Sequence, residues 1–424
     1  MKKIERTSPL DADVAAPPSK SVTARALLLA AMTEGPTTVV HPLDGDDPRY
    51  MLEAIRKAGF EVSGSFRDAI TIGERISMSA NEVEIFVGNA GTAMRFLTGF
   101  LAFTPGRYLI TGESRMLQRP IGGLVDALVS IGTELEYAGE EGFPPLRIRG
   151  RKMRGGFEVV LDAGLSSQFA SALMMAGAAL PDGLDLRLRS LVSRPYLEIT
   201  ARILRDFGAT VREIASDHYR VEPSRLQCNH YEVEGDYSSA SYWFAAAIAT
   251  GGTVRVSGLR ADSAQGDRRF LDLLQSMGVA VSREGTVVTV QSKSPLKGGR
   301  FDLGDIPDVV PTLAAIAPLA SSPVEIVNIA NLRIKESDRI AVIASELRKL
   351  GVTVVEGADS LRIEPGWNDD PATIDPHEDH RIAMAFAISG LARGNVTIDH
   401  DQVVSKSYPR FWRTLDEIRG SQVS

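Results

Sequence analysis

Basic and hydroxyl side chains recur at the starts of the predicted helices of this 424-residue chain and in its loops. Lysine and arginine carry charge that holds phosphate and carboxylate groups, and serine and glutamine donate hydrogen bonds to their oxygens. A helix N-terminus adds unpaired N–H groups and a partial positive charge. The pattern therefore predicts a site for a multiply anionic ligand. Its candidate residues are Lys20, Ser21, Arg25, Arg119, Ser166, Ser167, Gln168, Ser193, Lys335, Arg339, Arg381 and Lys406.

Two acids, Asp308 and Glu336, stand among these basic residues. Carboxyl groups beside bound anions can move protons to and from a reacting substrate, so we expect them to form an acid–base pair. Each position also has a structural interpretation. A polar residue at a helix start can be only a cap, Arg25 can be a solvated helix residue, and Lys335 and Glu336 can be exposed neighbours on a helix.

The elements that must position these residues recur with a long period. In each copy a polar start leads into an apolar helix, a strand, a polar loop and a second helix that ends at a glycine, which is a βαβαββ-like unit. The glycines, 69 to 76 residues apart, are Gly59, Gly132, Gly208, Gly278, Gly351 and, in a weaker sixth copy, Gly420. The first helices are predicted to start within residues 18–21, 89–92, 166–168, 238–239, 307–308 and 379–381.

Six such units exceed what one hydrophobic core usually holds, so an α/β protein with two domains of three units each is expected. Domain one is predicted to contain residues 1–17 and 235–424, and domain two residues 18–234. The chain would then cross twice between them, and the two crossings would form a hinge. If all six helix starts point the same way, they face one cleft.

Composition and motifs exclude several classes of protein. With 47 Lys and Arg against 54 Asp and Glu, the net charge of −7 has the wrong sign for a surface that grips nucleic acid. The single cysteine, Cys228, allows neither an internal disulfide nor a multi-cysteine metal site and fits a reducing cytoplasm. His377 and His380 have no third ligand in pattern, so no metal is expected. Dinucleotide-binding, P-loop, zinc-protease and nucleophile-elbow motifs are also absent.

No membrane segment is expected either. The chain starts without the apolar run of a signal peptide. Its longest uncharged stretch, residues 163–181, contains three serines and a glutamine, so it is predicted to be a buried helix.

Ten stretches spread from Ser19 to Trp412 resemble the EPSP synthase family, and they occur in the family's order. They are SKSVTARALLLAA, VGNAGTAMRFL, TGESRMLQRPIG, LSSQFASALMM, VSRPYLEIT, EGDYSSASYWFAAA, IPDVVPTLAA, NLRIKESDR, EDHRIAMAF and SKSYPRFW. The resemblance implies two inside-out α/β barrel domains of three βαβαββ units each.

The resemblance also implies an activity. The family transfers the enolpyruvyl group of phosphoenolpyruvate to the 5-hydroxyl of shikimate 3-phosphate, through a tetrahedral ketal, and releases phosphate. This step belongs to chorismate and aromatic amino acid biosynthesis and uses no cofactor or metal. We therefore expect a cytoplasmic monomer whose partners are these two small substrates.

Residue roles follow from the same resemblance, with domain two on the shikimate 3-phosphate side and domain one on the phosphoenolpyruvate side. The phosphate of shikimate 3-phosphate would be held by Lys20, Ser166, Ser167 and Ser193. Its ring and hydroxyls would be surrounded by Ser21, Arg25, Gln168, Tyr196, Asp308, Asn331 and Lys335. Phosphoenolpyruvate would meet Lys20, Asn89, Gly91, Arg119, Gln168, Arg339, His380, Arg381 and Lys406. Glu336 would protonate the methylene carbon, and Asp308, with Lys20, would assist removal of the hydroxyl proton.

Three positions depart from the family pattern: Pro18 and Phe96 stand where Gly and Pro are common, and Tyr237 replaces a small residue.

Three other functions can be compared with the sequence. A UDP-N-acetylglucosamine enolpyruvyl transferase, which shares the fold and the chemistry, would carry a cysteine within residues 113–120, which contain none. A non-catalytic anion-binding protein on the same scaffold would not need both acids, so their presence disfavours it. A phosphate cyclase of related repeat type would need a nucleophilic histidine and nucleotide specificity.

Overall fold

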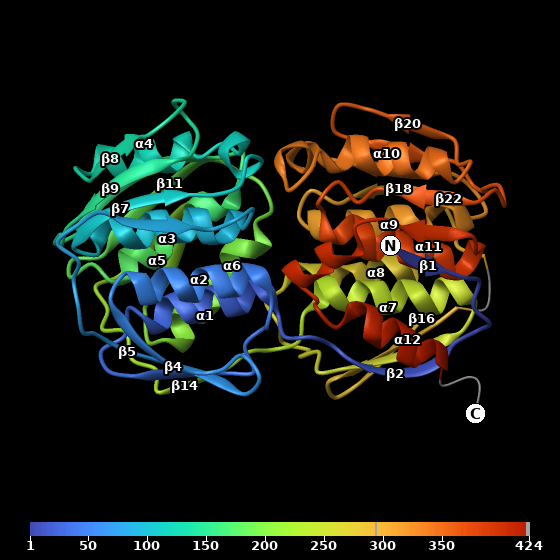
Figure 1. Ribbon diagram of the computed structural model, residues 1–424, viewed down its shortest axis with the longest axis horizontal. Coiled ribbons are helices and arrows are strands. Elements are labelled where there is room, and N and C mark those ends of the chain that lie inside the picture. Colours follow the sequence, from blue (N-terminus) through green and yellow to red (C-terminus); the bar gives the residue numbers. More distant parts are fainter. Residues whose placement is uncertain (293–294, 421–424) are drawn as a thin grey trace. The chain divides into compact units, whose positions relative to one another are not determined.

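The computed structural model describes residues 1–292 and 295–420 and divides into two compact units (Figure 1). Unit 1 comprises Met1–Pro17 and Glu234–Ser424, and unit 2 comprises Pro18–Val233. The second crossing therefore lies one residue earlier than the sequence predicts, because Glu234 belongs to unit 1.

The described part of unit 2 contains three four-stranded sheets, each with two helices in its repeat. The first has the order β14 (His230–Glu232), β3 (Thr37–Val40), β5 (Ala69–Arg75) and β4 (Phe60–Gly64), with α1 (Lys20–Ala30) and α2 (Asp46–Lys57). The second has β6 (Val83–Phe86), β7 (Gly106–Thr111), β9 (Leu146–Gly150) and β8 (Glu134–Tyr137), with α3 (Gly91–Phe103) and α4 (Gly122–Ser130). The third has β10 (Phe157–Ala163), β11 (Leu184–Leu191), β13 (His218–Val221) and β12 (Val211–Ala215), with α5 (Ser167–Ala178) and α6 (Pro195–Asp206).

Unit 1 repeats the same plan. Its first sheet has β2 (Asp11–Ala15), β15 (Thr253–Ser257), β17 (Val287–Gln291) and β16 (Ala280–Glu284), with α7 (Tyr237–Thr250) and α8 (Phe270–Ser276). The next has β18 (Gly299–Asp302), β19 (Val324–Val327), β21 (Leu361–Ile363) and β20 (Val354–Glu356), with α9 (Val310–Ile316) and α10 (Arg339–Lys349). The last has β22 (Ala372–Ile374), β23 (Val396–Ile398) and β1 (Lys2–Ile4), with α11 (His380–Arg393) and α12 (Phe411–Gly420). The short 3-10 helices are η1 (Met116–Gln118), η2 (Gly266–Arg269), η3 (Pro307–Val309), η4 (Ala317–Leu319), η5 (Ala330–Ile334) and η6 (Asp401–Lys406).

The two crossings exchange strands between the repeats. Strand β2 precedes α1 in the chain but pairs in parallel with β15, and β14 precedes α7 but pairs in parallel with β3. In the last sheet the N-terminal strand β1 pairs antiparallel with β23, in the place that a hairpin strand takes in the other sheets. The sixth copy is thus completed by the start of the chain, and it is not a full βαβαββ unit of its own.

The repeat glycines of the first five copies end the second helix for a stereochemical reason, whereas Gly420 of the sixth copy is itself the last residue of α12. Gly59, Gly132, Gly208, Gly278 and Gly351 all have φ between 79° and 97°. Each follows the C-cap of its helix, where a left-handed residue lets the chain turn into the next strand, and glycine adopts that conformation without a Cβ penalty. This requirement explains the sequence period.

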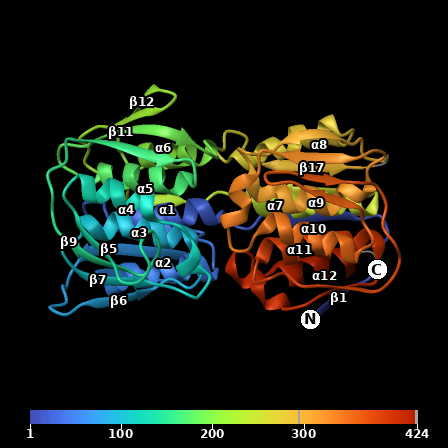
Figure 2. The ribbon, with the colours of Figure 1, turned by 90° about the horizontal axis from the view of Figure 1, so that it is seen from above.

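The first helix of each repeat lies inside its unit and the sheets lie around it, as Figures 1 and 2 show. All residues of α11 are buried, as are all residues of α5 except Gln168 and all residues of α3 except Thr92 and Phe103. The second helices are amphipathic, and α2 and α6 each bury one face. Helices inside and sheets outside are the inside-out α/β arrangement that the sequence predicted.

Tyr237, the unusual residue after the second crossing, is buried within unit 1. Its hydroxyl donates a 2.8 Å hydrogen bond to the backbone oxygen of Arg260, and its backbone N–H donates one of 3.0 Å to Oε1 of Gln265. The Gln265 amide in turn donates to Glu234 and Gly235. The large side chain therefore anchors the incoming chain to the loop that follows β15.

Candidate active site

Four helices of unit 2 begin at residues predicted from the sequence to bind substrate. These residues are Lys20 and Ser21 on α1, Asn89 and Gly91 at α3, Ser166, Ser167 and Gln168 at α5, and Ser193 and Tyr196 at α6. The Ser166 side chain caps α5 by accepting a 3.3 Å hydrogen bond from the backbone N–H of Gln168. The first turns of such helices attract anions, so each start can seat an oxyanion.

Arg119 lies over the start of α3. Its Nη1 donates 3.0 Å hydrogen bonds to both the backbone oxygen and Oδ1 of Asn89, and the residue is only 4% exposed. A Cβ atom added at Gly91 would lie 2.8 Å from Cζ of Arg119, so the guanidinium occupies space that only glycine leaves open. Three residues predicted to meet phosphoenolpyruvate are therefore in one place.

Two further contacts link the starts of neighbouring helices in unit 2. Nε2 of Gln168 donates a 3.2 Å hydrogen bond to Oγ1 of Thr92, which links α5 to α3. Nζ of Lys20 lies 3.1 Å from Oδ2 of Asp47 and links α1 to α2, with both side chains largely buried. Sequence reasoning included neither Thr92 nor Asp47 in the site, although Thr92 lies in the stretch VGNAGTAMRFL that it singled out.

Arg25 and Ser193 are also among the buried predicted residues of unit 2. Arg25 is 2% exposed, so the interpretation of this residue as a solvated helix arginine is wrong. Ser193 is buried at φ 53°, a left-handed conformation that is uncommon for a residue with a side chain. Residues held in such conformations cluster at ligand sites.

In unit 1, one arginine connects the two predicted acids. Arg339 Nη1 donates to Oδ1 of Asp308 at 3.1 Å, and Nη2 donates to Oε2 of Glu336 at 2.8 Å. Its Nε donates to Asp379 at 2.7 Å. Burial alone would lower the pKa of Arg339, but these three carboxylates raise it above its ordinary value. Glu336 is 9% exposed and precedes α10, so the interpretation as an exposed residue on a helix is wrong.

Arg381 extends this cluster. Its Nη2 donates a 2.7 Å hydrogen bond to Oδ2 of Asp308, so Asp308 accepts from two arginines. Burial raises the pKa of the neighbouring Tyr242 to about 12, although Arg381 and Arg339 oppose the change. The Tyr242 hydroxyl therefore stays protonated at neutral pH beside the arginines.

The remaining predicted residues of unit 1 lie on neighbouring elements. His380 is the buried first residue of α11, and Lys406 is buried at the end of η6, which packs against α11. Asn331 lies in η5 and Lys335 directly follows it, both of them half-buried. The direct hydrogen bonds described above join Asp308, Glu336, Arg339 and Arg381.

Sequence reasoning missed two buried acids of unit 1. Asp379 is 0% exposed and accepts from Arg339, from the Ser337 hydroxyl and from the backbone N–H of Arg381. Its place at a predicted helix start indicated a cap, which it is, but not its ion pair. Asp267, in η2, accepts a hydrogen bond from the Ser238 hydroxyl at the start of α7.

The ionisation of Asp267 gives a pH test of this cluster. Burial and the neighbouring charge of Asp308 raise the pKa of Asp267 to about 7. Because this value exceeds that of the unfolded chain, the folded state binds the extra proton, and stability falls as the pH rises from about 4 to about 7. Asp267→Asn removes this loss, so we expect the variant to gain about 2 to 4 kcal/mol relative to the parent protein between pH 4.5 and pH 7.5.

Urea unfolding of both proteins at the two pH values measures this gain. Asp272→Asn is the matched control, because Asp272 lies on the adjacent helix α8 and is exposed. An equal pH dependence of the Asp267→Asn variant and the parent protein would show that Asp267 does not titrate in this range.

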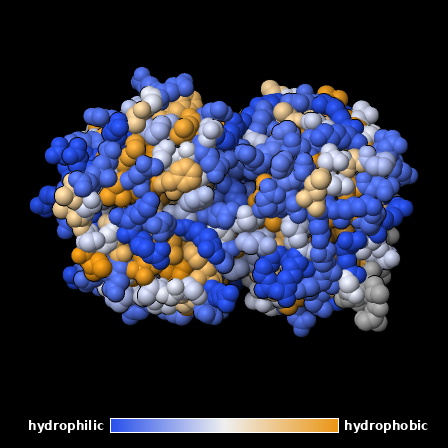
Figure 3. Space-filling model, viewed as in Figure 1, coloured by the Kyte–Doolittle hydropathy of each residue, from blue (hydrophilic) through white to orange (hydrophobic). Residues whose placement is uncertain are grey.

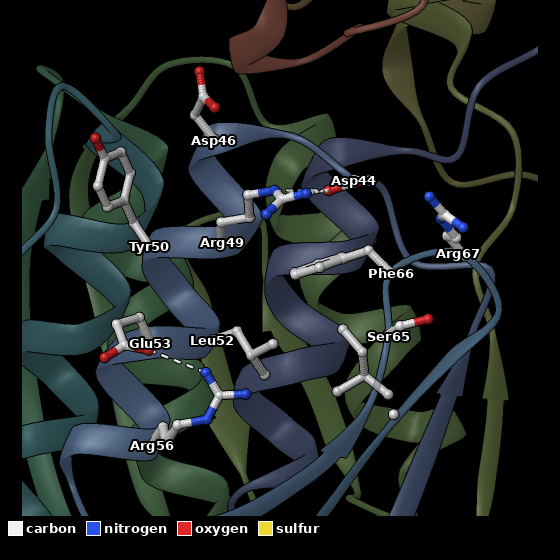
Figure 4. Close-up of a pocket in the computed structure, with 12 residues that line it drawn as sticks. Asp44, Asp46, Arg49, Tyr50, Leu52, Glu53, Arg56, Ser65, Phe66 and Arg67 are labelled. Atoms are coloured by element: carbon white, nitrogen blue, oxygen red, sulfur yellow. Dashed lines mark hydrogen bonds and ion pairs between the residues drawn. The ribbon is translucent and has the colours of Figure 1, made fainter.

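A cavity of about 650 Å³ in unit 2 lies away from all the predicted residues (Figure 4). It opens beside α2, where Arg49 forms an ion pair of 2.6 Å with Asp44 and its Cζ lies 5.6 Å from the centre of the Phe66 ring. A second cavity, of about 510 Å³, lies beside α8 in unit 1 and is lined by Arg268, Arg269 and Arg283. Each of these arginines already donates to oxygens of the chain.

Within residues 1–292 and 295–420, no three His, Cys, Asp or Glu side chains are grouped as metal ligands would be, and no helix combines the length and apolarity that a membrane span needs. Exposed large apolar side chains lie mainly on unit 2, including Ile76, Met78 and Phe86. On the face shown in Figure 3, the hydrophobic groups are scattered among hydrophilic ones.

The sequence model of one family, described as EPSP synthase (3-phosphoshikimate 1-carboxyvinyltransferase), matches residues 4–415. The chain belongs to the EPSP synthase family. A 3-phosphoshikimate 1-carboxyvinyltransferase of Methanoculleus marisnigri is 42% identical over 416 residues, which cover 97% of this chain and 98% of that protein. Another, from Psychromonas ingrahamii, is 39% identical over 417 residues, which cover 96% of this chain and 97% of that protein.

Solved structures agree with this membership. An EPSP synthase from Acinetobacter baumannii superposes with a TM-score of 0.81 at 26% identity, covering 98% of this chain and 97% of that one. The enolpyruvyl transferase NikO from Streptomyces tendae, at 18% identity and a TM-score of 0.77, covers 98% of this chain and 96% of that one and shows the fold alone. The family, the inside-out α/β fold and the transferase class predicted from the sequence are confirmed.

Proposed function

We propose that this member of the EPSP synthase family transfers the enolpyruvyl group of phosphoenolpyruvate to the 5-hydroxyl of shikimate 3-phosphate, with release of inorganic phosphate. One observation carries the assignment of this chemistry to particular residues. Arg339 donates hydrogen bonds to both Asp308 and Glu336, the two acids that the reaction needs. An acid–base pair held beside two fixed arginines suits proton transfer on an anionic substrate.

Electrostatics explain the number of basic residues. The tetrahedral ketal carries two phosphates and a carboxylate, so roughly five negative charges must be stabilised by donors that are already in place. Unit 2 supplies Lys20, Arg25 and Arg119, and unit 1 supplies Arg339, Arg381 and Lys406. Arg119, Arg339 and Arg381 are each at most 5% exposed and held by hydrogen bonds, so they need little reorganisation during the reaction.

Shikimate 3-phosphate is assigned to unit 2, chiefly to the starts of α5 and α6. Ser166, Ser167 and Ser193 direct hydroxyl and backbone donors to its phosphate, together with Lys20. The capping contact of Ser166 and the left-handed backbone of Ser193 support this role. Its ring and hydroxyls are assigned to Ser21, Arg25, Gln168, Tyr196, Asp308, Asn331 and Lys335.

Phosphoenolpyruvate is assigned to Lys20, Asn89, Gly91, Arg119, Gln168, Arg339, His380, Arg381 and Lys406. The contact between Arg119 and Asn89 over Gly91 supports the part of this assignment in unit 2. The bond of Arg381 to Asp308 supports the part in unit 1.

Proton transfers to and from the two acids complete the mechanism. Glu336 gives its proton to the methylene carbon while the 5-hydroxyl oxygen attacks the adjacent carbon, and Asp308, assisted by Lys20, receives the hydroxyl proton. The ketal then expels phosphate, which leaves with the proton held by Asp308. The new methyl group returns a proton to Glu336, which restores the carbon–carbon double bond. Both acids thereby return to their starting states. We propose that a monomer in the cytoplasm carries out the reaction without a metal or cofactor, as the family resemblance implies.

Phosphate release tests the proposal directly. The protein is incubated with shikimate 3-phosphate and phosphoenolpyruvate, and each substrate is omitted in turn. Phosphate should appear only when both are present. Phosphate no higher than in the single-substrate controls would refute the activity, and phosphate from either substrate alone would indicate a phosphatase instead.

A further inference from the structure

The guanidinium of Arg25 lies at the junction of four helices of unit 2. Its Nη1 donates to the backbone oxygen of Ser21 on α1 at 2.9 Å, and its Nε donates to Oγ1 of Thr200 on α6 at 2.8 Å. Its Nη2 donates to Oγ of Ser171 on α5 at 3.3 Å and to the backbone oxygen of Tyr196 on α6 at 3.2 Å. Arg25 thus ties α1 to both helices whose starts are assigned to shikimate 3-phosphate.

The fourth helix, α3, contributes an aromatic ring. Cζ of Arg25 lies 4.9 Å from the centre of the Phe96 ring, and Phe96 is 1% exposed. The face of an aromatic ring is negative and attracts a cation within about 6 Å of its centre. A proline at this position, as the family commonly has, would offer no such ring.

The Phe96 ring gives the buried positive charge of Arg25 a favourable contact. Among the described residues, the acceptors of its hydrogen bonds are neutral oxygens. Burial lowers the pKa of Arg25 to about 10, which leaves it charged at neutral pH. A buried cation surrounded by neutral acceptors is costly, so each favourable contact helps to hold it in one position.

We propose that Phe96 is a positioning residue for substrate binding: its ring holds the Arg25 guanidinium, and the pair fixes the start of α3 relative to the starts of α1, α5 and α6. This inference rests on the proposed function, because those starts carry the residues assigned to the two substrates. Phe96 itself, buried one turn inside α3, acts through Arg25.

Phe96→Leu keeps an apolar side chain but removes the ring. We expect the KM for shikimate 3-phosphate, and its dissociation constant in calorimetric titration, to rise by about 2- to 30-fold, the range that a cation–π contact spans. We expect kcat to change less than KM, because Glu336 and Asp308, the assigned proton donor and acceptor, are in unit 1. Phe96→Tyr restores a ring and should restore most of the affinity.

Phe100→Leu is the matched control. Phe100 lies one turn further along α3, is 5% exposed and packs on the Phe60 ring at 5.7 Å. The Phe100→Leu variant should lose about as much stability as Phe96→Leu and keep the parent KM for shikimate 3-phosphate. An unchanged KM in Phe96→Leu, or an equal increase in Phe100→Leu, would overturn the inference. If Phe96→Leu does not fold, Phe96→Met is measured against the same criteria.

The parent protein separates this inference from the proposed function. Parent protein that releases phosphate, together with a Phe96→Leu variant of unchanged affinity, refutes only the role of Phe96. A parent protein that releases no phosphate from the two substrates refutes the proposed function and the inference with it.

Discussion

Replacement of Glu336 by glutamine is expected to lower turnover by about two to four orders of magnitude, the usual share of general acid–base catalysis. Glutamine has the size of glutamate, and its amide oxygen can still accept the hydrogen bond from Arg339, but it cannot deliver a proton at neutral pH. Binding of shikimate 3-phosphate should change little, because its phosphate is assigned to unit 2. Phosphate release and calorimetric titration measure the two quantities separately.

Glu356→Gln is the matched control for this variant. Glu356 also accepts a hydrogen bond from an arginine of unit 1, at 3.1 Å from Arg333, but has no assigned role. Its variant should turn over at the parent rate. If Glu336→Gln keeps its turnover, the acid is another group, with Asp308 and Lys20 as the candidates. If turnover and binding are lost together, Glu336 is structural and its assigned role is wrong.

Local patterns were enough to predict much of the fold. The glycines after the second helices must adopt positive φ, so their spacing appears in the sequence and reveals the repeat. The sequence placed residues 1–17, which contain β2, in domain one, but it did not identify the strands with which β2 and β14 pair. Strand pairing depends on contacts between residues more than 190 positions apart, such as Val39 with Tyr231, and a strand as short as β14 contains no record of its partner. For the same reason, the pairing of the N-terminal strand β1 with β23 in the sixth sheet could not be predicted.

The site shows the same division between local and distant information. Helix starts are local, so Ser166 and Gly91 could be identified from sequence and from the family resemblance. The hydrogen bonds of Arg339 join Asp308, Glu336 and Asp379, which lie in three separate segments of the chain. These contacts exist only in the folded chain. Asp379 was recognised as a helix start, but its second role as the buried partner of Arg339 depends on that folding.

Arg119→Ala should reduce kcat/KM for phosphoenolpyruvate by roughly 2 to 5 kcal/mol, or about 30- to 5,000-fold, the cost of truncating one partner of a buried charge pair. The guanidinium is 4% exposed and is oriented by both oxygens of Asn89, so it presents a fixed fork of donors to an anion. The loss should appear mainly in the KM for phosphoenolpyruvate. Steady-state phosphate release at varied phosphoenolpyruvate and saturating shikimate 3-phosphate measures it.

Arg151→Ala and Arg67→Ala serve as controls, because both arginines lie outside the assigned stretches and the Arg151 side chain is 52% exposed. They should keep the parent kinetics, and equal losses at all three positions would show that the assignment of Arg119 carries no information.

Gly91→Ala tests the contact between Arg119 and the start of α3 from the other side. Its methyl group would lie 2.8 Å from Cζ of Arg119, so it must displace the guanidinium without removing its charge. If position matters as well as charge, this variant also raises the KM for phosphoenolpyruvate. A parent-like KM would show that Arg119 acts only through its charge.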